Sequence, residues 1–321
     1  MTTSDASIKR APAGFFSTLI TLGLLGSLLS ATSVFSANAL FFDLLSNFRI
    51  QYIVLILPVL LLALWYRRFL VAFIVAACLS LHVVTVAVSL YPSIASESVE
   101  GPAVRVMTSN LFSSNNDYVN HINRIREIDP DLIVFQEYTP AWASELSVAL
   151  DQYPYIVARV LDHPFGIALY SKFPLTESKV VSLETSSRPS IEAVAAFGNY
   201  SLQIFGAHPP PPTSVAWYHE RNRNLLQIAQ QYAASPDPVV IMGDLNITLW
   251  SAHFKRFLES GGFDHSRRGI GILPTWPAQV TALQIPIDHI VFNDKLTVNT
   301  MEKVKGLQSD HLTVWADLRI K

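Results

Sequence analysis

The sequence predicts an α/β protein, in which a four-layer α/β/β/α sandwich follows three transmembrane helices. Three observations predict this class. Long apolar runs without a charged residue fill much of the first ninety of the 321 residues. After residue 101, helical and strand-like patterns alternate at first, and strands then dominate. Many of these strands end in polar side chains, which favours two sheets packed face to face with helices outside.

The uncharged runs cover residues 11–42, 50–66 and 69–90. Each is about long enough to cross the hydrocarbon core of a bilayer, which takes roughly 20 apolar residues. We therefore predict a membrane anchor over residues 1–91. Its three transmembrane helices are expected at about 15–40, 50–66 and 69–90.

The basic residues beside these runs predict the orientation of the chain. Lys9 and Arg10 precede the first run, and Arg67 and Arg68 separate the second from the third. Positive charge marks the cytoplasmic side, so we expect a cytoplasmic N-terminus and everything after residue 91 outside. An alternative is a signal peptide that is cleaved near residues 37–39. The two remaining spans would still leave the large domain outside.

A polar stretch at residues 92–101 predicts a linker to a catalytic domain at 102–321. Amphipathic helices are expected at 117–128, 142–150, 216–234 and 254–258. Strands are expected at 104–110, 131–137, 155–160, 166–171, 179–183, 191–197, 200–207, 239–246, 286–292 and 312–320.

The charge balance and the cysteine content restrict the classes of function that the chain can have. Residues 1–91 contain five of the 23 basic residues and two of the 25 acidic ones. The remaining 18 basic and 23 acidic residues give the rest of the chain a net charge of −5. A domain that grips nucleic acid usually carries a basic face, so this balance argues against a nuclease. The lone Cys78 excludes an intrachain disulfide.

The run at 239–246 ends in Gly243-Asp244-Leu245-Asn246, directly after a buried, β-branched segment. In extended backbone, Asp244 and Asn246 would point to the same side. A carboxylate and a carboxamide placed together can handle a water molecule and a phosphate oxygen. The alternative is that both residues merely begin a turn.

Other expected strands also begin or end in residues that can carry chemistry. The set is Asn110, Glu137, His208, Asp244, Asn246, Asp288, Asp310 and His311. Oxygen-rich sets of this kind suit Mg²⁺, Mn²⁺ or Ca²⁺, and Glu137 and Asp310 are candidate ligands. His311 is a candidate general base if Asp288 orients its ring. Phosphate ester hydrolysis uses such a combination of metal, base and phosphoryl-oxygen donors.

Five short motifs resemble those of the endonuclease/exonuclease/phosphatase superfamily, which has a DNase I-like fold. In chain order they are Ser109-Asn110, Gln136-Glu137, Gly243-Asp244-Leu245-Asn246, Ile287-Asp288-His289-Ile290 and Ser309-Asp310-His311. The resemblance covers roughly residues 102–320. It implies a Mg²⁺ site, with Mn²⁺ as an alternative, at Asn110, Glu137 and Asp310. The implied catalytic residues are His208, Asp244, Asn246, Asp288 and His311.

The resemblance also implies a role for each catalytic side chain. Asp244 would position or deprotonate the attacking water, and Asn246 would contact the phosphate. His208 would stabilise the charged phosphoryl oxygens. Asp288 would orient His311, which acts as the base or as a phosphate ligand. Family mechanisms differ on whether Asp244 or the His–Asp pair is the base, and both remain open here.

The apolar N-terminus, the run His208-Pro209-Pro210-Pro211-Pro212 and the following Arg-x-Arg helix resemble a narrower, membrane-anchored branch of VanJ-like bacterial proteins. This resemblance implies a multi-pass protein of the bacterial inner (cytoplasmic) membrane with a periplasmic or extracellular catalytic domain. It also implies the lipid bilayer as partner and a lipid-linked phosphate as substrate. Arg221 and Arg223 are candidate clamps for the substrate phosphate, with a solvated helix face as the alternative.

Three functions are therefore weighed. The leading hypothesis is a membrane-anchored, divalent-metal-dependent phosphohydrolase acting on a lipid-linked phosphate or pyrophosphate. The first alternative is a membrane-anchored nuclease, which the acidic domain disfavours. The second alternative is a non-catalytic membrane component, which the complete set of site residues disfavours.

Overall fold

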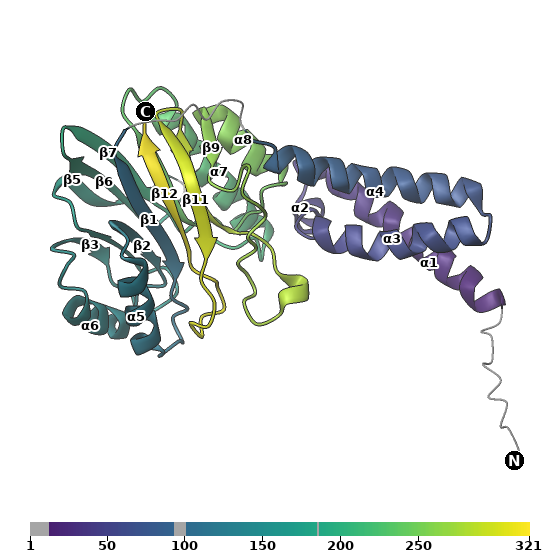
Figure 1. The fold of residues 1–321 in the computed structure, drawn as a ribbon, viewed down its shortest axis with the longest axis horizontal. Coiled ribbons are helices and arrows are strands. Elements are labelled where there is room, and N and C mark those ends of the chain that lie inside the picture. Colours follow the sequence, from purple (N-terminus) through teal and green to yellow (C-terminus); the bar gives the residue numbers. More distant parts are fainter. Residues whose placement is uncertain (1–12, 93–100, 185) are drawn as a thin grey trace, which may run out of the picture.

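The computed structural model describes residues 13–92, 101–184 and 186–321. A bundle of helices projects from one end of a two-sheet domain (Figure 1). Most of the expected linker at 92–101 and the basic pair Lys9 and Arg10 lie outside the described residues.

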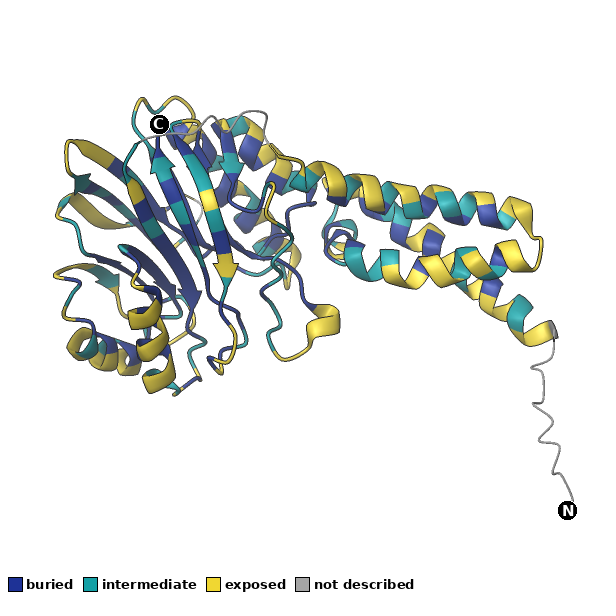
Figure 2. Ribbon diagram, in the orientation of Figure 1, coloured by how far each residue is buried: buried dark blue, intermediate teal, exposed yellow. Residues whose placement is uncertain are grey.

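The N-terminal segment forms a helical bundle. Its elements are α1 (Ala13–Ala31), the 3₁₀ helix η1 (Thr32–Phe35), α2 (Leu40–Ser46), α3 (Arg49–Trp65) and α4 (Phe69–Leu90). Figure 2 shows many exposed positions along this bundle, whereas the strands of the domain are mostly buried. Such exposed apolar surface is expected of helices that face lipid.

Two of the three expected spans are continuous helical segments. The segments Gly14–Phe35 and Phe69–Leu90 are long and apolar enough to cross a membrane. The third candidate is the pair α2 and α3, which is bent by 70° at its break. The prediction of three spans is therefore confirmed for two of them, and the third is a helix pair and not the single helix expected at 50–66. The first span also ends at Phe35 and not near residue 40. The short helix α2, which the sequence reading did not separate, carries Asp43 and turns toward the domain.

The domain is built from two six-stranded sheets. The first has the order β11-β12-β1-β2-β4-β3, and the second has the order β5-β6-β7-β8-β10-β9. The strands of the first sheet are β1 (Ala103–Asn110), β2 (Leu132–Gln136), β3 (Tyr155–Arg159), β4 (Ile167–Ser171), β11 (Leu296–Lys303) and β12 (Val314–Ile320). Those of the second are β5 (Leu175–Ser182), β6 (Pro189–Phe197), β7 (Tyr200–Gly206), β8 (Val239–Asp244), β9 (Phe263–His265) and β10 (Asp288–Asn293).

The layers follow from the two faces of each sheet, both of which are buried along the central strands. Inward-facing residues such as Val106, Val134, Ile204 and Met242 form one core between the two sheets. The opposite faces are covered by helices, since a strand points successive side chains to opposite sides. Helices α5 (Tyr118–Ile128) and α6 (Pro140–Ala149) pack on the first sheet. Helices α7 (Val215–Tyr232) and α8 (Ala252–Gly261) pack on the second. The α/β/β/α order expected from the sequence is thus present.

Two parallel strand pairs bring distant polar residues to one edge of the sandwich. β1 pairs with β2 so that Asn110 lies beside Gln136, and β7 pairs with β8 so that Gly206 lies beside Met242. The carboxyl ends of all four strands therefore point the same way. β10 runs antiparallel to β8 and begins at Asp288, directly opposite Asp244.

Gly243 allows β8 to lie close to the chain that leaves β7. Its φ is +154°, and an added Cβ would come within 1.8 Å of the carbonyl oxygen of Ala207. Only glycine adopts this conformation at such a distance without displacing the backbone. The close approach brings His208 next to Asp244.

The helical bundle is packed against the domain. Val86 of α4 belongs to the core of the second sheet, and Ile50, Ile53 and Leu90 pack against that core. The Gln51 amide also donates to the carbonyl oxygen of Gln284, at 3.2 Å. The bundle is therefore a structural part of the domain.

Candidate active site

A pocket of about 510 Å³ opens at the edge where the parallel strands end. Six of the eight polar residues singled out from the sequence line it. They are Glu137, His208, Asp244, Asn246, Asp310 and His311. The other two, Asn110 and Asp288, are buried behind this layer and hydrogen-bond to it. The structure therefore brings the whole predicted set together.

Asp244 lies at the centre of the site and is buried. Its Oδ2 atom is 3.5 Å from Nε2 of His208 and 3.6 Å from Nε2 of His311. The side-chain amide of Asn110 donates to the same oxygen at 3.2 Å. Burial alone would raise the pKa of Asp244, but the two imidazoles outweigh this effect and lower it. The site thus stabilises an ionised carboxylate.

His311 is held by a second carboxylate. Its Nδ1 donates to Asp288 Oδ2 at 2.9 Å, and both side chains are buried. Burial alone would lower the pKa of His311, but Asp288 and Asp244 outweigh it and raise the pKa to about 10. The imidazole therefore keeps a fixed orientation, with Nε2 toward Asp244.

Two carboxylates on the other side of the pocket fit a hard cation. Glu137 follows β2, and its Oε2 accepts a hydrogen bond from the Ser113 amide at 2.7 Å. Asp310 Oδ2 accepts from the indole of Trp276 at 3.2 Å, while its buried Oδ1 has no hydrogen-bond partner. Burial raises the pKa of Asp310, with Glu137 adding to the effect. An unsatisfied buried carboxylate oxygen beside a second carboxylate suits Mg²⁺ or Mn²⁺.

A different trio, Asp244, Asp288 and His311, also has ligand atoms within 4.8 Å of one another. However, Nδ1 of His311 already donates to Asp288, and protonation of the ring opposes binding of a metal. Glu137 and Asp310 are the better match to a divalent cation.

The backbone conformation that brings Asn246 to the site differs from the predicted extended strand. Strand β8 ends at Asp244, and Asn246 has a left-handed φ of +53°. Its backbone amide donates to Asp244 Oδ1 at 3.0 Å, and its side-chain amide donates to the Pro209 carbonyl. The expectation of two side chains on one face of an extended strand is therefore wrong. A tight turn of the kind that Asp favours brings the two residues together.

Glu137 shares this backbone feature, with a left-handed φ of +57°. Non-glycine residues adopt such values rarely, and they cluster at functional sites. Glu137 lies one position beyond β2, and Asn246 lies two positions beyond β8.

A family model described as "Endonuclease/Exonuclease/phosphatase family" matches residues 107–311, more than half of the chain. The chain belongs to this family. Its members hydrolyse phosphoester bonds, in accordance with the carboxylates and imidazoles that meet in the pocket. No curated protein is significantly similar to the chain.

Solved structures with the same fold are similar to the chain at low sequence identity. TDP2 from D. rerio, complexed with a single-strand DNA product, is 15% identical with a TM-score of 0.59, and the match covers 68% of this chain and 99% of that one. An endonuclease/exonuclease/phosphatase from Beutenbergia cavernae is 19% identical with a TM-score of 0.57, covering 68% and 72%. Sphingomyelinase C from Streptomyces griseocarneus is 19% identical with a TM-score of 0.51, covering 67% and 99%.

Arg221 and Arg223, the two candidate phosphate clamps, do not line this pocket. Arg221 is buried, and its Nη2 donates to Oδ2 of Asp43 in α2 at 2.7 Å. Its Nη1 donates to the Asn246 carbonyl at 2.8 Å. Arg223 is exposed and borders a separate hollow beside residues 37 and 38. Arg221 therefore joins the bundle to the catalytic turn, a position that does not fit direct contact with substrate.

Sequence reasoning missed the residues that the bundle adds to the pocket. Leu44 of α2 and Asn47, which follows α2, both line it. Phe165, Trp217 and Ile285 extend the same apolar wall. No local motif marks Leu44 as a site residue, because it reaches the pocket only through the packing of α2 on the domain.

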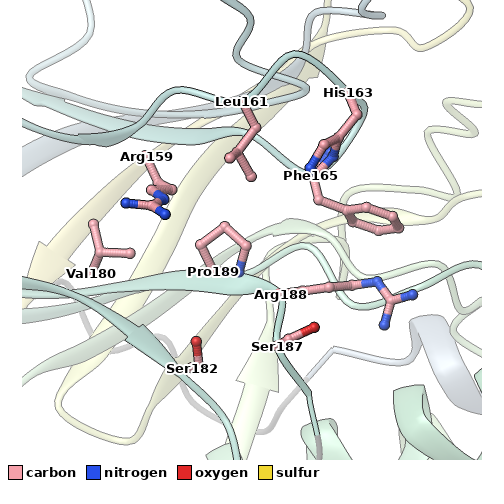
Figure 3. A pocket seen from close by; sticks show the side chains of 9 residues that line it. All are labelled: Arg159, Leu161, His163, Phe165, Val180, Ser182, Ser187, Arg188 and Pro189. Atoms are coloured by element: carbon pink, nitrogen blue, oxygen red, sulfur yellow. The ribbon is translucent and has the colours of Figure 1, made fainter.

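A second hollow of about 500 Å³ adjoins the pocket and shares Phe165 with it. Figure 3 shows Arg188 extending beneath the Phe165 ring, with Arg159 farther along the hollow. The Arg188 guanidinium lies 4.4 Å from the Phe165 ring centroid and forms an ion pair with Glu220. Glu220 therefore neutralises the positive charge of Arg188.

Proposed function

We propose that this family member is a membrane-anchored, divalent-metal-dependent phosphohydrolase that cleaves a lipid-linked phosphate or pyrophosphate. We place the enzyme in a bacterial inner membrane, with a cytoplasmic N-terminus and the catalytic domain at the outer face. The likeness to the VanJ-like branch and the distribution of basic residues support this orientation.

One observation carries the lipid assignment. The pocket has a polar floor of carboxylates and imidazoles and an apolar wall that includes Leu44 from the helical bundle. An amphiphilic substrate requires such a division, because its phosphate needs polar partners and its chain needs apolar ones. Leu44 lies where the bundle meets the domain, so an acyl chain that contacts it would stay beside the apolar bundle.

In this proposal the chain's own residues divide the reaction between them. Glu137 and Asp310 hold Mg²⁺, which supplies charge neutralisation at the phosphoryl oxygens. Asp244 orients the attacking water and accepts its proton. His208 and His311 donate to the phosphoryl oxygens, and Asp288 fixes the ring of His311.

The test uses the full-length chain in detergent. Undecaprenyl pyrophosphate, phospholipids and plasmid DNA are each supplied with Mg²⁺ or with EDTA, and released phosphate or nicked DNA is measured. We expect phosphate from a lipid substrate, dependence on the metal, and loss of turnover in Asp244→Asn. The matched control Arg223→Gln should retain full activity. DNA cleavage without release of phosphate from any lipid would refute the assignment.

A substitution of Leu44 tests the lipid assignment by comparing a lipid substrate with a small soluble one. Leu44→Trp should raise KM for the lipid several-fold while leaving kcat/KM for bis(p-nitrophenyl) phosphate, a small soluble ester, unchanged. Equal loss on both substrates would show that Leu44 supports the fold and not lipid binding.

A second candidate function, an anchored nuclease, is favoured by one feature. Arg159 and Arg188 border the hollow that adjoins the pocket, where a polyanion could continue beyond the cleaved phosphate. The ion pair of Arg188 with Glu220 and the net charge of −5 after residue 91 weaken this reading. Plasmid nicking that Asp244→Asn abolishes and that Arg159→Gln weakens would establish it.

A further inference from the structure

A second cavity, separate from the catalytic pocket, lies between the helical bundle and the outer helix layer of the domain. Its volume is about 610 Å³, within the roughly 300–1,000 Å³ typical of ligand sites. None of its lining residues belongs to the catalytic pocket. Helices α4 and α8 and the chain before α8 contribute its walls.

One wall of this cavity is apolar and belongs to α4. Leu81, Val84 and Val88 recur at helical spacing and cover about 10 Å of one helix face. Val84 is 58% exposed and Val88 is 65% exposed. Exposed apolar side chains on a candidate membrane helix are expected to contact acyl chains.

Basic side chains also line the cavity. Arg49, Lys255 and Arg268 line it, together with a single carboxylate from Glu259. Lys255 and Glu259 are 3.6 Å apart, and Arg268 pairs with Asp264.

Arg49 has no such partner. Its side chain is buried, with Nη1 donating to Nδ1 of His82 at 3.2 Å and Nη2 donating to the Ser33 carbonyl at 3.4 Å. Among the described residues, no carboxylate lies within 4.0 Å of its guanidinium. A buried cation without a counter-charge is costly, so an anion in this cavity would be strongly favoured.

Three buried nitrogen atoms of the lining residues also lack hydrogen-bond partners. They are Nε of Arg49, Nε1 of Trp250 and Nδ1 of His265. All three residues are at least nine-tenths buried. Because Nε2 of His265 donates to the Ser89 carbonyl, Nδ1 is free to accept. The lining residues of the cavity therefore include polar groups that the protein itself leaves unpaired.

We propose that this cavity is a binding site for an anionic phospholipid of the surrounding membrane, distinct from the substrate site. The phosphate pairs with Arg49, and an acyl chain lies along the exposed apolar face of α4. Basic pockets beside membrane helices bind lipid headgroups in this way. Such a lipid would be a structural ligand of the junction between bundle and domain.

The probe is phosphatidylglycerol, compared with phosphatidylcholine that has the same acyl chains. The full-length chain, carrying Asp244→Asn so that no lipid is turned over, is delipidated in detergent and re-equilibrated with each lipid. Native mass spectrometry then counts the lipids retained. We expect one phosphatidylglycerol per chain, bound at least about tenfold more tightly than phosphatidylcholine. Equal retention of the two lipids would overturn the proposal.

Single substitutions test whether the lipid binds in this cavity. Arg49→Gln should abolish the preference for phosphatidylglycerol, whereas the exposed arginine control Arg223→Gln should not change it. If Arg49→Gln does not fold, Arg49→Lys keeps the charge but removes the paired donors of the guanidinium and should weaken retention several-fold. Unchanged retention in the folded Arg49→Gln variant, or in Arg49→Lys where Arg49→Gln cannot be made, counts against the site.

A matched pair of tryptophan substitutions separates this cavity from the substrate pocket. Val84→Trp fills the proposed site, and Ile285→Trp fills the catalytic pocket. Retention should fall in the first variant and persist in the second. The reverse result would place the lipid in the catalytic pocket and refute a second site, while leaving the proposed hydrolase activity intact.

Discussion

The ion pair between Asp43 and Arg221 is the contact whose removal tests most directly how the bundle supports the site. The two side chains are each 1% exposed, and 178 residues separate them in the chain. Asp43 also accepts from Ser251 at 2.6 Å, and Arg221 also donates to the Asn246 carbonyl at 2.8 Å. One buried network therefore connects α2 to the turn that follows Asp244.

The single variant Arg221→Met leaves the Asp43 carboxylate buried without its counter-charge. Breaking a buried pair in this way costs about 3–5 kcal/mol, because the remaining charge stays desolvated. For a domain of this size, each kcal/mol lowers the midpoint of thermal unfolding by about 2–4 °C. The expected decrease is thus about 6–20 °C.

The assay is thermal unfolding of the full-length chain in detergent, with phosphate release measured on the same samples. The double variant Asp43→Leu with Arg221→Met removes both charges and should recover most of the lost stability. Its activity should nevertheless stay low, because the Asn246 carbonyl has lost its donor. The double variant would then be nearly as stable as the unmodified chain but much less active.

Two results would refute this reasoning. If Arg221→Met unfolds at the same temperature as the unmodified chain, the pair is not buried in the folded protein. If the double variant recovers full activity, Arg221 does not position the catalytic turn.

Four further predictions follow. Asp288→Asn should lower kcat about 10⁴-fold, because His311 loses the carboxylate that orients it; a loss below tenfold would contradict this role. Gly243→Ala should destabilise the chain by more than about 3 kcal/mol in denaturant unfolding, since its Cβ would overlap the Ala207 carbonyl. Burial lowers the pKa of His265 to about 3, so unfolding takes up a proton and stability should fall as pH drops from about 6.5 toward 3; His265→Phe should flatten this dependence. Chelation with EDTA should abolish turnover, Mg²⁺ or Mn²⁺ should restore it, and the unfolding temperature should rise with added metal.

The positions of the strands that carry the site could be predicted from local pattern alone. Runs such as 239–242 are β-branched and apolar, and they must be buried on both faces. A polar residue directly after such a run, such as Asp244, has to lie at the sheet edge. The same reasoning predicted Glu137 and His208, because each follows a strand of one of the two parallel pairs.

Features that depend on distant partners could not be predicted in this way. Arg221 is on an amphipathic helix, and nothing nearby in the chain indicates that Asp43 will meet it. Leu44 is one apolar residue among many until α2 bends away from α3. Strands β9 and β11 were also missed, since β9 has three residues and β11 mixes polar with apolar side chains. In each case tertiary packing decides what local periodicity leaves open.

The docking of α2 has a consequence for where catalysis takes place. A catalytic domain on a loose tether samples many heights above a membrane, whereas this pocket shares Leu44 and Asn47 with the bundle itself. In a chain anchored as proposed, the distance from the lipid surface to Asp244 is therefore a fixed length. For the proposed lipid substrate such an arrangement works as a ruler, because molecules that diffuse sideways in the bilayer are sorted by how far their scissile bond stands above it.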